Sequence, residues 1–437
     1  MAEMKLLAVA GAPVLHSRSP RIFERLFAGQ GREAAFIRLS AGSAGEAAAA
    51  AAAMGLAGFN VTAPLKSAVL PHLHRIQPEA RAVEAVNCVV VRGGRWTGHN
   101  TDIPGSARAL ASKGIEVAGK RVAVLGAGGA ARAAALGAVR SGAAAVVLMN
   151  RTPERAEAAA RRLGCAWALL KEMPDVLGRS DILVSCLSGA ETPVRRSWLR
   201  RGLAVLDANY RDSPLAGEAA EAGCVVVDGT EWLLHQAFLS FRLFTGRDAS
   251  PAARAEAREA LQAEEERPRR NLGLIGFMGS GKSALGALLA ERTGFSLVDT
   301  DAVIESAAGM TVADIFKTRG EGYFRRREKA LLAARLPGAR RTVFAFGGGT
   351  VLDGENRALI RRSCRTVWLW ASPRTASRRV EPASRPLLEG DGDGRRAEEL
   401  FRSRLPLYAR LSDLVVSTES ATPEEAARRI QHECETG

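Results

Sequence analysis

The sequence predicts an α/β protein with mostly parallel sheets, because short β-branched and apolar runs alternate with helical runs along almost the whole chain. Two of these runs are followed by glycine-rich loops of different kinds, at residues 126–131 (GAGGAA) and 276–283 (GFMGSGKS). Each loop opens an alanine-rich helical run, so each is expected to lie between a strand and a helix. The clearest strands are expected at residues 6–10, 121–125, 145–149, 182–185, 204–207, 224–227, 272–275, 342–345 and 366–370.

The length and composition indicate several hydrophobic cores and no membrane segment. At roughly 150 residues per domain, 437 residues correspond to about three compact units, and 47% of the residues are hydrophobic. No apolar run reaches the roughly 18 residues that span a bilayer. The first residues lack the basic and apolar regions of a secretion signal. We therefore expect a cytoplasmic protein without a membrane partner.

The cysteines and the charge argue against other classes. The six cysteines are scattered and form no Cys-x-x-Cys pair, so neither a zinc site nor a disulfide framework is indicated. The net charge of +14 is compatible with nucleic-acid binding. However, the arginines are spread along the chain, and no nucleic-acid module is recognisable. We expect anionic small-molecule substrates and no nucleic-acid partner.

A change of composition divides the chain near residue 264. Pro251 begins a helical run rich in alanine and charge, which then gives way to residues 264–270 (EEERPRR). This short segment has no apolar face, so we expect a solvated linker there. A new domain is expected to begin at Asn271 and to continue to residue 437.

The first glycine loop has the spacing of a dinucleotide site. Gly126 permits a tight turn, Gly128 lets the backbone approach a pyrophosphate, and Ala131 lets the helix pack closely on the strand. NAD-specific folds place a carboxylate after the next strand, but this chain offers Arg151 and Arg155 there instead. A guanidinium can hold a 2′-phosphate with two parallel hydrogen bonds, so the sequence favours NADP over NAD.

A dense set of polar residues precedes this loop. Ser17 and Ser19 lie between two prolines, and Asn60, Thr62 and Lys66 share one short segment. An asparagine and an aspartate follow further along the chain, at Asn87 and Asp102. Together these side chains indicate a site for a polyhydroxylated substrate, with a lysine–aspartate pair for proton transfer.

On these residues, the segment from 1 to about 262 resembles shikimate dehydrogenases. The resemblance implies a substrate lobe at residues 1–101, completed by return helices at about 232–263, and a Rossmann lobe for NADP at residues 102–231. It implies reversible reduction of the 3-keto group of 3-dehydroshikimate by NADPH, with Lys66 as the catalytic acid and base paired with Asp102. The sequence departs from the family at residues 185–190 (SCLSGA), where an Asn-Ala-Thr-type strand end is usual.

The same resemblance assigns the ligand contacts. Ser17 and Ser19 are expected to hold the substrate carboxylate. The other expected substrate contacts are Asn60, Thr62, Lys66, Asn87, Asp102, Tyr210 and Gln236. The expected NADP contacts are Gly126, Ala127, Gly128, Gly129, Ala130, Asn150, Arg151, Thr152, Arg155 and Gly229.

The second glycine loop meets the pattern Gly-x-x-x-x-Gly-Lys-Ser in full. In such a loop, backbone N–H groups cradle phosphates. Lys282 is expected to reach the outer phosphates, and the Ser283 hydroxyl is expected to bind Mg²⁺. The expected ATP contacts are Gly279, Ser280, Gly281, Lys282, Ser283, Ala284 and Arg385.

Further residues indicate the phosphoryl acceptor, and with them residues 271 to about 420 resemble shikimate kinase. The resemblance implies that Asp301 binds the substrate hydroxyls and helps to deprotonate one of them. It implies that Arg325 and Arg404 hold the carboxylate and that Gly348 contacts the substrate through its backbone. It also assigns Arg385 to a lid over ATP and Asp299 to the surroundings of magnesium, through water.

The two resemblances together imply a bifunctional enzyme of the shikimate pathway toward chorismate and the aromatic amino acids. The first half would form the 3-hydroxyl of shikimate, and the second half would phosphorylate it. Two alternatives stay open: a first half that also accepts quinate, and a shikimate-responsive regulator with one inactive half. Intact catalytic residues argue against the regulator, namely Lys66, Asp102, Lys282 and Asp301.

Overall fold

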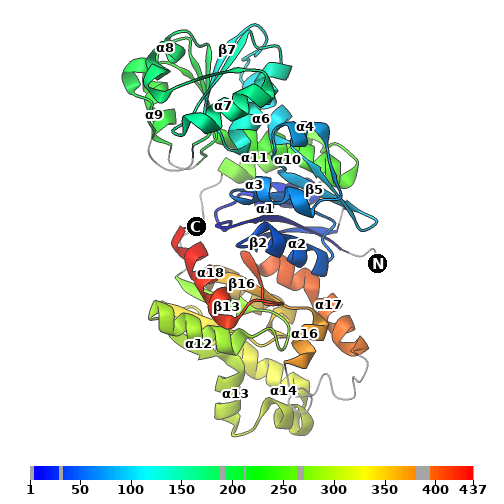
Figure 1. Cartoon of the computed structure of the whole chain (residues 1–437). Coiled ribbons are helices and arrows are strands. Elements are labelled where there is room, and N and C mark those ends of the chain that lie inside the picture. Colours follow the sequence, from blue (N-terminus) through cyan, green and yellow to red (C-terminus); the bar gives the residue numbers. More distant parts are fainter. Residues whose placement is uncertain are drawn as a thin grey trace. The chain divides into compact units, whose positions relative to one another are not determined.

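The structure is a computed structural model that describes residues 4–28, 33–187, 192–210, 213–262, 270–379 and 394–436. It divides into two compact units (Figure 1). The first unit contains Met1–Pro20, Glu33–Leu56 and Glu264–Gly437, and the second contains Arg21–Arg32 and Ala57–Ala263. Residues 264–269 of the expected linker lie outside the described residues.

The second unit contains a sheet of six parallel strands in the order β12-β11-β10-β7-β8-β9. Alternate residues of its central strand, such as Val122 and Ala123, belong to two different hydrophobic cores on opposite faces. Helices α6 and α7 pack into one core, and α8 and α9 pack into the other. This is a doubly wound arrangement, whose loops at the carboxyl ends of the strands form ligand sites. The elements are β7 (Arg121–Leu125), β8 (Ala145–Met149), β9 (Ala166–Ala168), β10 (Ile182–Ser185), β11 (Ala204–Asp207), β12 (Val225–Val227), α6 (Gly129–Arg140), α7 (Pro153–Leu163), α8 (Met173–Gly178) and α9 (Pro214–Glu221).

The remainder of this unit joins short strands to helices that pack on the six-stranded lobe. Strand β5 pairs antiparallel with β3 and with β6, and β6 pairs parallel with β4. Gly93 and Gly94 close the β5–β6 hairpin with φ of 53° and 73°, values that suit a tight two-residue turn. The elements are β3 (Gly58–Val61), β4 (Arg75–Ile76), β5 (Cys88–Arg92), β6 (Arg95–His99), α3 (Leu65–Ala68), α4 (Pro78–Ala82), α5 (Asp102–Ala111), α10 (Gly229–Thr245) and α11 (Pro251–Gln262).

Helix α5 occupies a central place because it contacts both α6 and α10. A Cβ built on Gly137 of α6 would lie 2.6 Å from the carbonyl oxygen of Ile103, so this crossing has no room for a side chain. Gly105 of α5 similarly faces Gln236 of α10, with 3.1 Å between a built Cβ and the glutamine Cβ. The close packing fixes the N-terminus of α5, where Asp102 lies.

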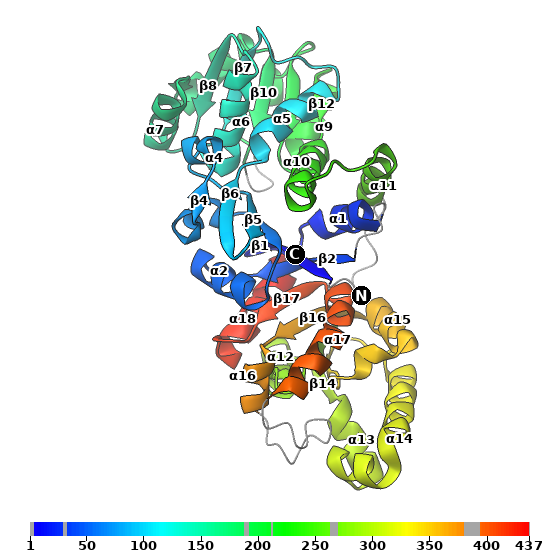
Figure 2. The same cartoon turned by 90° about the vertical axis from the view of Figure 1, so that its right-hand side faces the viewer.

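The first unit contains parallel strands in the order β14-β15-β13-β16-β17-β2-β1 (Figure 2). Strands β1 and β2 come from the first 40 residues of the chain, and the other five come from residue 271 onward. The strands are β1 (Lys5–Gly11), β2 (Ala34–Ser40), β13 (Asn271–Ile275), β14 (Ser296–Asp299), β15 (Thr342–Ala345), β16 (Cys364–Trp370) and β17 (Leu414–Ser417). The helices are α2 (Ala44–Ala53), α12 (Lys282–Thr293), α13 (Thr300–Ala308), α14 (Val312–Arg335), α15 (Gly354–Ser363), α16 (Pro373–Arg378), α17 (Arg395–Leu411) and α18 (Pro423–Thr436). Helix α1 (Ser19–Ala28) begins in this unit and continues into the second.

The α/β class and the nine strands expected from the sequence are confirmed, with ends that differ by at most two residues. Both glycine loops lie where a parallel strand gives way to a helix, after β7 and after β13. None of the described helices is long and apolar enough to cross a membrane.

Candidate active sites

A lysine and an aspartate form the centre of the site in the second unit. Lys66 lies on the short helix α3, and Asp102 is the first residue of α5. The Nζ of Lys66 donates to Oδ2 of Asp102 at 2.6 Å, and the aspartate side chain is only 9% exposed. An ion pair that is largely shielded from water keeps a fixed geometry, which proton transfer requires.

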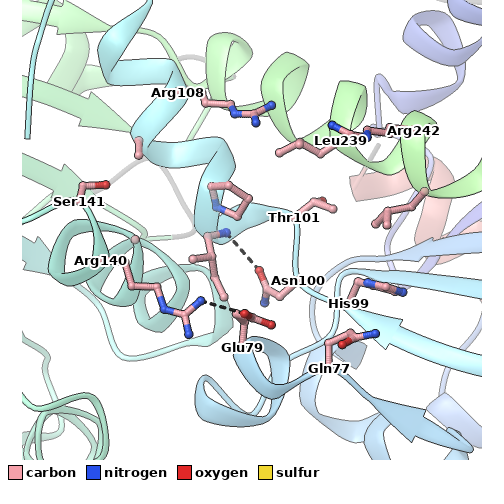
Figure 3. Close-up of a pocket in the computed structure, with 15 residues that line it drawn as sticks. Gln77, Glu79, His99, Asn100, Thr101, Arg108, Arg140, Ser141, Leu239 and Arg242 are labelled. Atoms are coloured by element: carbon pink, nitrogen blue, oxygen red, sulfur yellow. Dashed lines mark hydrogen bonds and ion pairs between the residues drawn. The ribbon is translucent and has the colours of Figure 1, made fainter. Parts of the chain in front are cut away.

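The orientation of Asp102 is set by its neighbours. Asn100 accepts hydrogen bonds from the backbone N–H groups of Asp102 at 3.1 Å and Ile103 at 3.3 Å, so it satisfies the start of α5. The indole of Trp232 donates to the carbonyl oxygen of Asp102 at 3.1 Å. Figure 3 shows the Asn100 side chain turned toward the start of α5, at the edge of a cavity of about 620 Å³. Neither Lys66 nor Asp102 lines that cavity.

A buried amide and hydroxyl network surrounds the pair. Asn87 accepts from Thr101 N at 2.7 Å and donates to Thr101 Oγ1 at 2.9 Å and to Gln236 Oε1 at 3.4 Å. Asn60 donates to the carbonyl oxygen of Asn87 at 2.9 Å and to the hydroxyl of Ser240 at 3.0 Å. The structure therefore brings Asn60, Asn87 and Gln236 together as expected from the sequence. Ser240 was missed, although it follows Gln236 by one helical turn.

The dinucleotide loop lies against Lys66. A Cβ built on Gly129, the first residue of α6, would be 3.6 Å from Cβ and Cδ of Lys66. Gly126 has φ of +119°, which favours glycine, and Gly128 has open space around its Cα. A phosphate can therefore approach the backbone at the N-terminus of α6, so the loop fits a dinucleotide.

The remaining residues expected near the cofactor lie at the ends of neighbouring strands. Arg151 and Arg155 are exposed after β8, and Asn150 donates to the carbonyl oxygen of Thr152 at 3.0 Å. Gly229 begins α10, and a Cβ on it would lie 2.6 Å from the carbonyl oxygen of Asp207, so packing alone requires glycine there. Two alanines of the loop were also expected to contact NADP. Ala127 is buried, and Ala130 is half-buried.

The atypical segment after β10 is described only as far as residue 187. Cys186 N donates to the carbonyl oxygen of Leu125 at 2.9 Å, which places the cysteine beside Gly126. Burial raises the pKa of the Cys186 thiol, and the carboxylates of Asp207 and Asp102 raise it further. The thiol is therefore protonated near neutral pH and contributes no charge to the site.

Four further residues expected to bind substrate lie on loops or at the start of a helix. Thr62 is half-buried after β3 and accepts a backbone hydrogen bond from Leu65 at 2.9 Å. Tyr210 is half-buried after β11. Ser17 and Ser19 belong to the first unit and are 6% and 4% exposed. Ser17 lies on the loop between β1 and α1, and Ser19 is the first residue of α1.

The P-loop between β13 and α12 has the backbone that phosphate binding requires. Gly276, Gly279 and Gly281 have φ of 151°, 77° and 91°, and a Cβ on Gly279 would overlap the carbonyl oxygen of Ala376. Lys282 donates to the carbonyl oxygens of Gly276 at 3.1 Å and Phe277 at 2.9 Å, which keeps its ammonium at the loop. Ser280 is buried, whereas Ser283 and Ala284 are exposed at the start of α12. The loop thus fits a nucleoside triphosphate.

The oxygen ligands around this loop suit a magnesium ion that is bound mainly through phosphates and water. Asp299 caps α13, because its Oδ1 accepts from the N–H groups of Asp301 at 3.1 Å and Ala302 at 3.2 Å. Within the described ranges, no group of three histidine, cysteine, aspartate or glutamate side chains could hold a metal ion. Mg²⁺ commonly uses one or two protein oxygens with substrate phosphates, and the Ser283 hydroxyl and the Asp299 carboxylate are oxygen ligands of that kind.

The four residues expected to bind the phosphoryl acceptor line one small cavity of about 50 Å³. They are Asp301, Arg325, Gly348 and Arg404. Met278 of the P-loop lines the same cavity, so the acceptor pocket adjoins the phosphate loop. Sequence spacing alone could not bring these residues together, because they come from four separate elements.

Arg325 and Arg404 are held in place by hydrogen-bond partners that the sequence did not indicate. Arg325 donates to Glu328 Oε2 at 2.9 Å and to Glu321 Oε1 at 3.0 Å. Glu328 is 1% exposed, and burial raises its pKa while Arg325 opposes that shift. Arg404 is 2% exposed and donates to the carbonyl oxygen of Gly348 at 3.3 Å, an acceptor that it shares with Tyr408. The sequence signal that could have indicated Glu328 is its position about one helical turn after Arg325.

The arginine expected on a lid over ATP, Arg385, lies outside the described residues. A doubly wound dinucleotide lobe beside a lysine–aspartate pair, on one chain with a P-loop next to a small acceptor pocket, defines the class. The protein is an oxidoreductase joined to a P-loop kinase.

Comparison with known proteins identifies the families. Residues 9–89 match the shikimate dehydrogenase substrate binding domain, residues 109–209 match shikimate / quinate 5-dehydrogenase, and residues 278–435 match shikimate kinase. A shikimate dehydrogenase (NADP(+)) from Moorella thermoacetica is 35% identical over 61% of this chain and 97% of its own length. A shikimate kinase from Symbiobacterium thermophilum is 43% identical over 37% of this chain and 93% of its own length. The chain belongs to the shikimate dehydrogenase family in its N-terminal part and to the shikimate kinase family in its C-terminal part.

Solved structures agree with the first assignment. The shikimate 5-dehydrogenase of Thermus thermophilus, determined in complex with NADP(H) and shikimate, is 33% identical with a TM-score of 0.54. The match covers 59% of this chain and all of the other chain. A quinate dehydrogenase from Corynebacterium glutamicum is 29% identical with the same TM-score. The chain is thus an enzyme that carries a shikimate dehydrogenase domain and a shikimate kinase domain.

Proposed function

We propose that this enzyme reduces 3-dehydroshikimate to shikimate with NADPH and then transfers the γ-phosphoryl group of ATP to the 3-hydroxyl of shikimate. One observation carries the proposal: each phosphate loop lies against the residues assigned to the reacting hydroxyl. Gly129 of the dinucleotide loop faces Lys66, and Met278 of the P-loop shares a cavity with Asp301. The membership of both families supports the same pair of reactions.

In the first reaction, NADPH supplies a hydride to the carbonyl carbon. Negative charge then develops on the carbonyl oxygen, and the Lys66 ammonium donates the proton that completes the new hydroxyl. Asp102 orients Lys66 by accepting its hydrogen bond at 2.6 Å. Asn87, Thr62 and the other polar residues of the network hold the ring hydroxyls. Ser17 and Ser19 hold the carboxylate of the substrate.

Several residues support NADP as the cofactor of this reaction. Arg151 and Arg155 are exposed after β8, where a 2′-phosphate is expected, and the residue that directly follows β8 is Asn150 rather than a carboxylate. The relatives named as NADP(+) enzymes and the complex with NADP(H) agree with this choice. We assign Asn150, Thr152 and Gly229 to the same cofactor surface.

In the second reaction, magnesium-bound ATP supplies the phosphoryl group. The P-loop backbone and Lys282 hold the phosphates, while Ser283 and, through water, Asp299 hold the metal. Asp301 lies in the acceptor cavity and receives or orients the proton of the attacking hydroxyl. Arg325 and Arg404 bind the carboxylate, and their buried partners keep both guanidinium groups in place.

Assays of the purified chain with single-site variants test this function. The unaltered chain should oxidise NADPH with 3-dehydroshikimate and release ADP only when shikimate is present. Lys66→Ala should abolish the first activity and spare the second, and Lys282→Ala should do the reverse. Binding of shikimate without either turnover would instead support a sensor. Quinate oxidation at a rate close to that of shikimate would broaden the first activity to the alternative substrate.

A further inference from the structure

We propose that Glu433, on the last helix of the kinase segment, is a positioning residue for the dehydrogenase reaction. It holds the loop that carries Ser17 and Ser19, and it thereby sets the affinity for the substrate carboxylate. This inference rests on the role proposed above for those two serines. All of the contacts that support it lie within the first unit.

Glu433 is fully buried on α18 and each of its carboxylate oxygens has a partner. Its Oε2 accepts from the backbone N–H groups of Val14 at 2.8 Å and Leu15 at 2.9 Å. Its Oε1 accepts from the hydroxyl of Ser40 at 2.6 Å. Three hydrogen bonds to one buried carboxylate are strong, because the groups have no competing water.

A second side chain, Arg38, contacts the same loop. Arg38 donates from Nε to the carbonyl oxygen of Ser17 at 2.8 Å and from Nη1 to the carbonyl oxygen of Asp413 at 3.2 Å. Arg38 thus connects the serine loop to the residue just before β17. Glu433 lies 419 residues from Val14 along the chain, and Arg38 links Ser17 to Asp413, which lies 375 residues from Arg38.

The pairing of strands β2 and β17 explains how these distant segments of the chain come together. Strand β2 pairs in parallel with β17, with Leu39 opposite Val415 and Ser40 opposite Val416. An ion pair between Arg429 of α18 and Glu46 of α2 adds a further contact between the same segments. Sheet pairing therefore brings α18 to the end of β1, where the serine loop begins.

Loss of the Glu433 carboxylate would leave the N–H groups of Val14 and Leu15 without an acceptor. Buried donors without a partner are costly, so the loop would shift until water or another acceptor reached them. The Ser17 N–H bonds to the carbonyl oxygen of Val14 at 2.9 Å, so a shift at Val14 moves Ser17 as well. Lys66 and Asp102 make none of these contacts. We expect the change to weaken substrate binding and to leave proton transfer unaffected.

The test compares Glu433→Gln with Glu435→Gln in the full chain. Both residues lie on α18, and Glu435 is exposed. Glutamine keeps the size of Glu433, but it carries no charge and has only one acceptor oxygen, so the charge-assisted hydrogen bonds from Val14, Leu15 and Ser40 are lost. We expect Glu433→Gln to weaken the apparent affinity for the keto acid substrate, measured as a rise in its KM, by about 5- to 100-fold, the range for a lost buried hydrogen bond. The maximal turnover, the KM for NADPH and the kinase activity should stay close to those of the unaltered chain, and Glu435→Gln should change none of these values.

A substrate analogue and a second variant separate positioning from general destabilisation. The methyl ester of 3-dehydroshikimate lacks the carboxylate charge. Glu433→Gln should therefore lower the ratio of the specificity constant for the acid to that for the ester. A purely structural role would lower the melting temperature and the maximal turnover of both reactions without changing that preference. If Glu433→Gln does not fold, Arg38→Gln must show the same rise in KM and the same loss of preference.

The outcomes distinguish this inference from the function on which it rests. An unchanged KM and an unchanged acid preference in the folded variants, with normal turnover in the unaltered chain, would overturn the role of Glu433 alone. Absence of any 3-dehydroshikimate reduction by the unaltered chain would overturn the proposed function, and this inference with it.

Discussion

The Nζ of Lys66 lies 2.6 Å from Oδ2 of Asp102, and the same lysine packs against Gly129 at the start of the dinucleotide helix. One side chain therefore contacts both the carboxylate that orients it and the loop assigned to the hydride donor. This geometry is suited to the delivery of a hydride and a proton to adjacent atoms of one carbonyl group.

Replacement of Lys66 by alanine should slow the reduction of the keto substrate by about 10²- to 10⁴-fold, the usual contribution of a positioned acid. Shikimate should still bind, because the amide and hydroxyl network around Asn87 is untouched. Steady-state kinetics and shikimate titration measure the two effects. The exposed Lys113 provides the control, since Lys113→Ala should leave the rate unchanged. Normal turnover in Lys66→Ala would exclude this lysine as the acid.

Gly349→Ala should impair the kinase reaction alone. A Cβ at Gly349 would overlap Nη2 of Arg325, so the guanidinium would have to leave its place beside Glu328. We expect the KM for shikimate to rise by about tenfold or more, as for a lost charge-assisted hydrogen bond. Gly338→Ala is the matched control, because no atom lies within 4 Å of its built Cβ. Equal kinetics for the two variants would contradict the place assigned to Arg325.

Arg151 and Arg155 should determine the preference for NADPH. Replacement of both by glutamine removes two exposed guanidinium groups without adding a carboxylate. The preference for NADPH over NADH, expressed as the ratio of their specificity constants, should fall by about 10- to 100-fold, the value of one or two charge-assisted hydrogen bonds. Arg161→Gln on the same helix should leave the ratio unchanged. A ratio unaffected by the double substitution would place the 2′-phosphate elsewhere.

His235 should make the fold sensitive to acid. Burial, with the nearby Arg258, lowers the pKa of His235 from 6.5 to about 4. The unfolded chain then binds a proton at this residue between pH 6.5 and pH 4, whereas the folded chain does not. Stability from this residue is therefore complete above pH 6.5 and is lost as the pH falls toward 4, by at most about 1.4 kcal/mol per pH unit.

Urea unfolding between pH 4 and pH 7 measures this dependence. His235→Gln should flatten the fall in the free energy of unfolding over that interval, relative to the unaltered chain. The exposed His72 is the control, and His72→Gln should leave the slope as it is. A slope that does not differ between the unaltered chain and His235→Gln would show that His235 is not kept neutral by the fold.

Local patterns made much of this molecule predictable. The glycine spacing of residues 126–131 and 276–283 depends on backbone geometry within one strand–loop–helix unit, and both loops lie where they were expected. The residues expected to bind the phosphoryl acceptor line one cavity. Arg325 and Arg404 reach it from inside α14 and α17, which tertiary packing determines, but Asp301 and Gly348 come just after strands β14 and β15, at the carboxyl edge of the parallel sheet. Such positions can be inferred from short motifs.

Contacts that depend on tertiary packing could not be inferred in this way. Apart from its spacing from Arg325, Glu328 resembles any charged helical residue in the sequence, and its burial and its hydrogen bonds with Thr350 and Arg325 show that it supports the pocket. Glu433 lies on a helix with many charges, and its partners are Val14, Leu15 and Ser40. Separations of about 400 residues leave no periodic signal along a chain.

The central claim is that the hydroxyl formed in the first half is the one phosphorylated in the second. The most direct measurement supplies the purified chain with 3-dehydroshikimate, ATP, Mg²⁺ and NADPH deuterated at both C4 positions, and then analyses the product by mass spectrometry and NMR. We predict shikimate 3-phosphate that carries one deuterium on the carbon bearing the phosphate. A phosphate on any unlabelled carbon, or labelled shikimate that is never phosphorylated, would contradict the account.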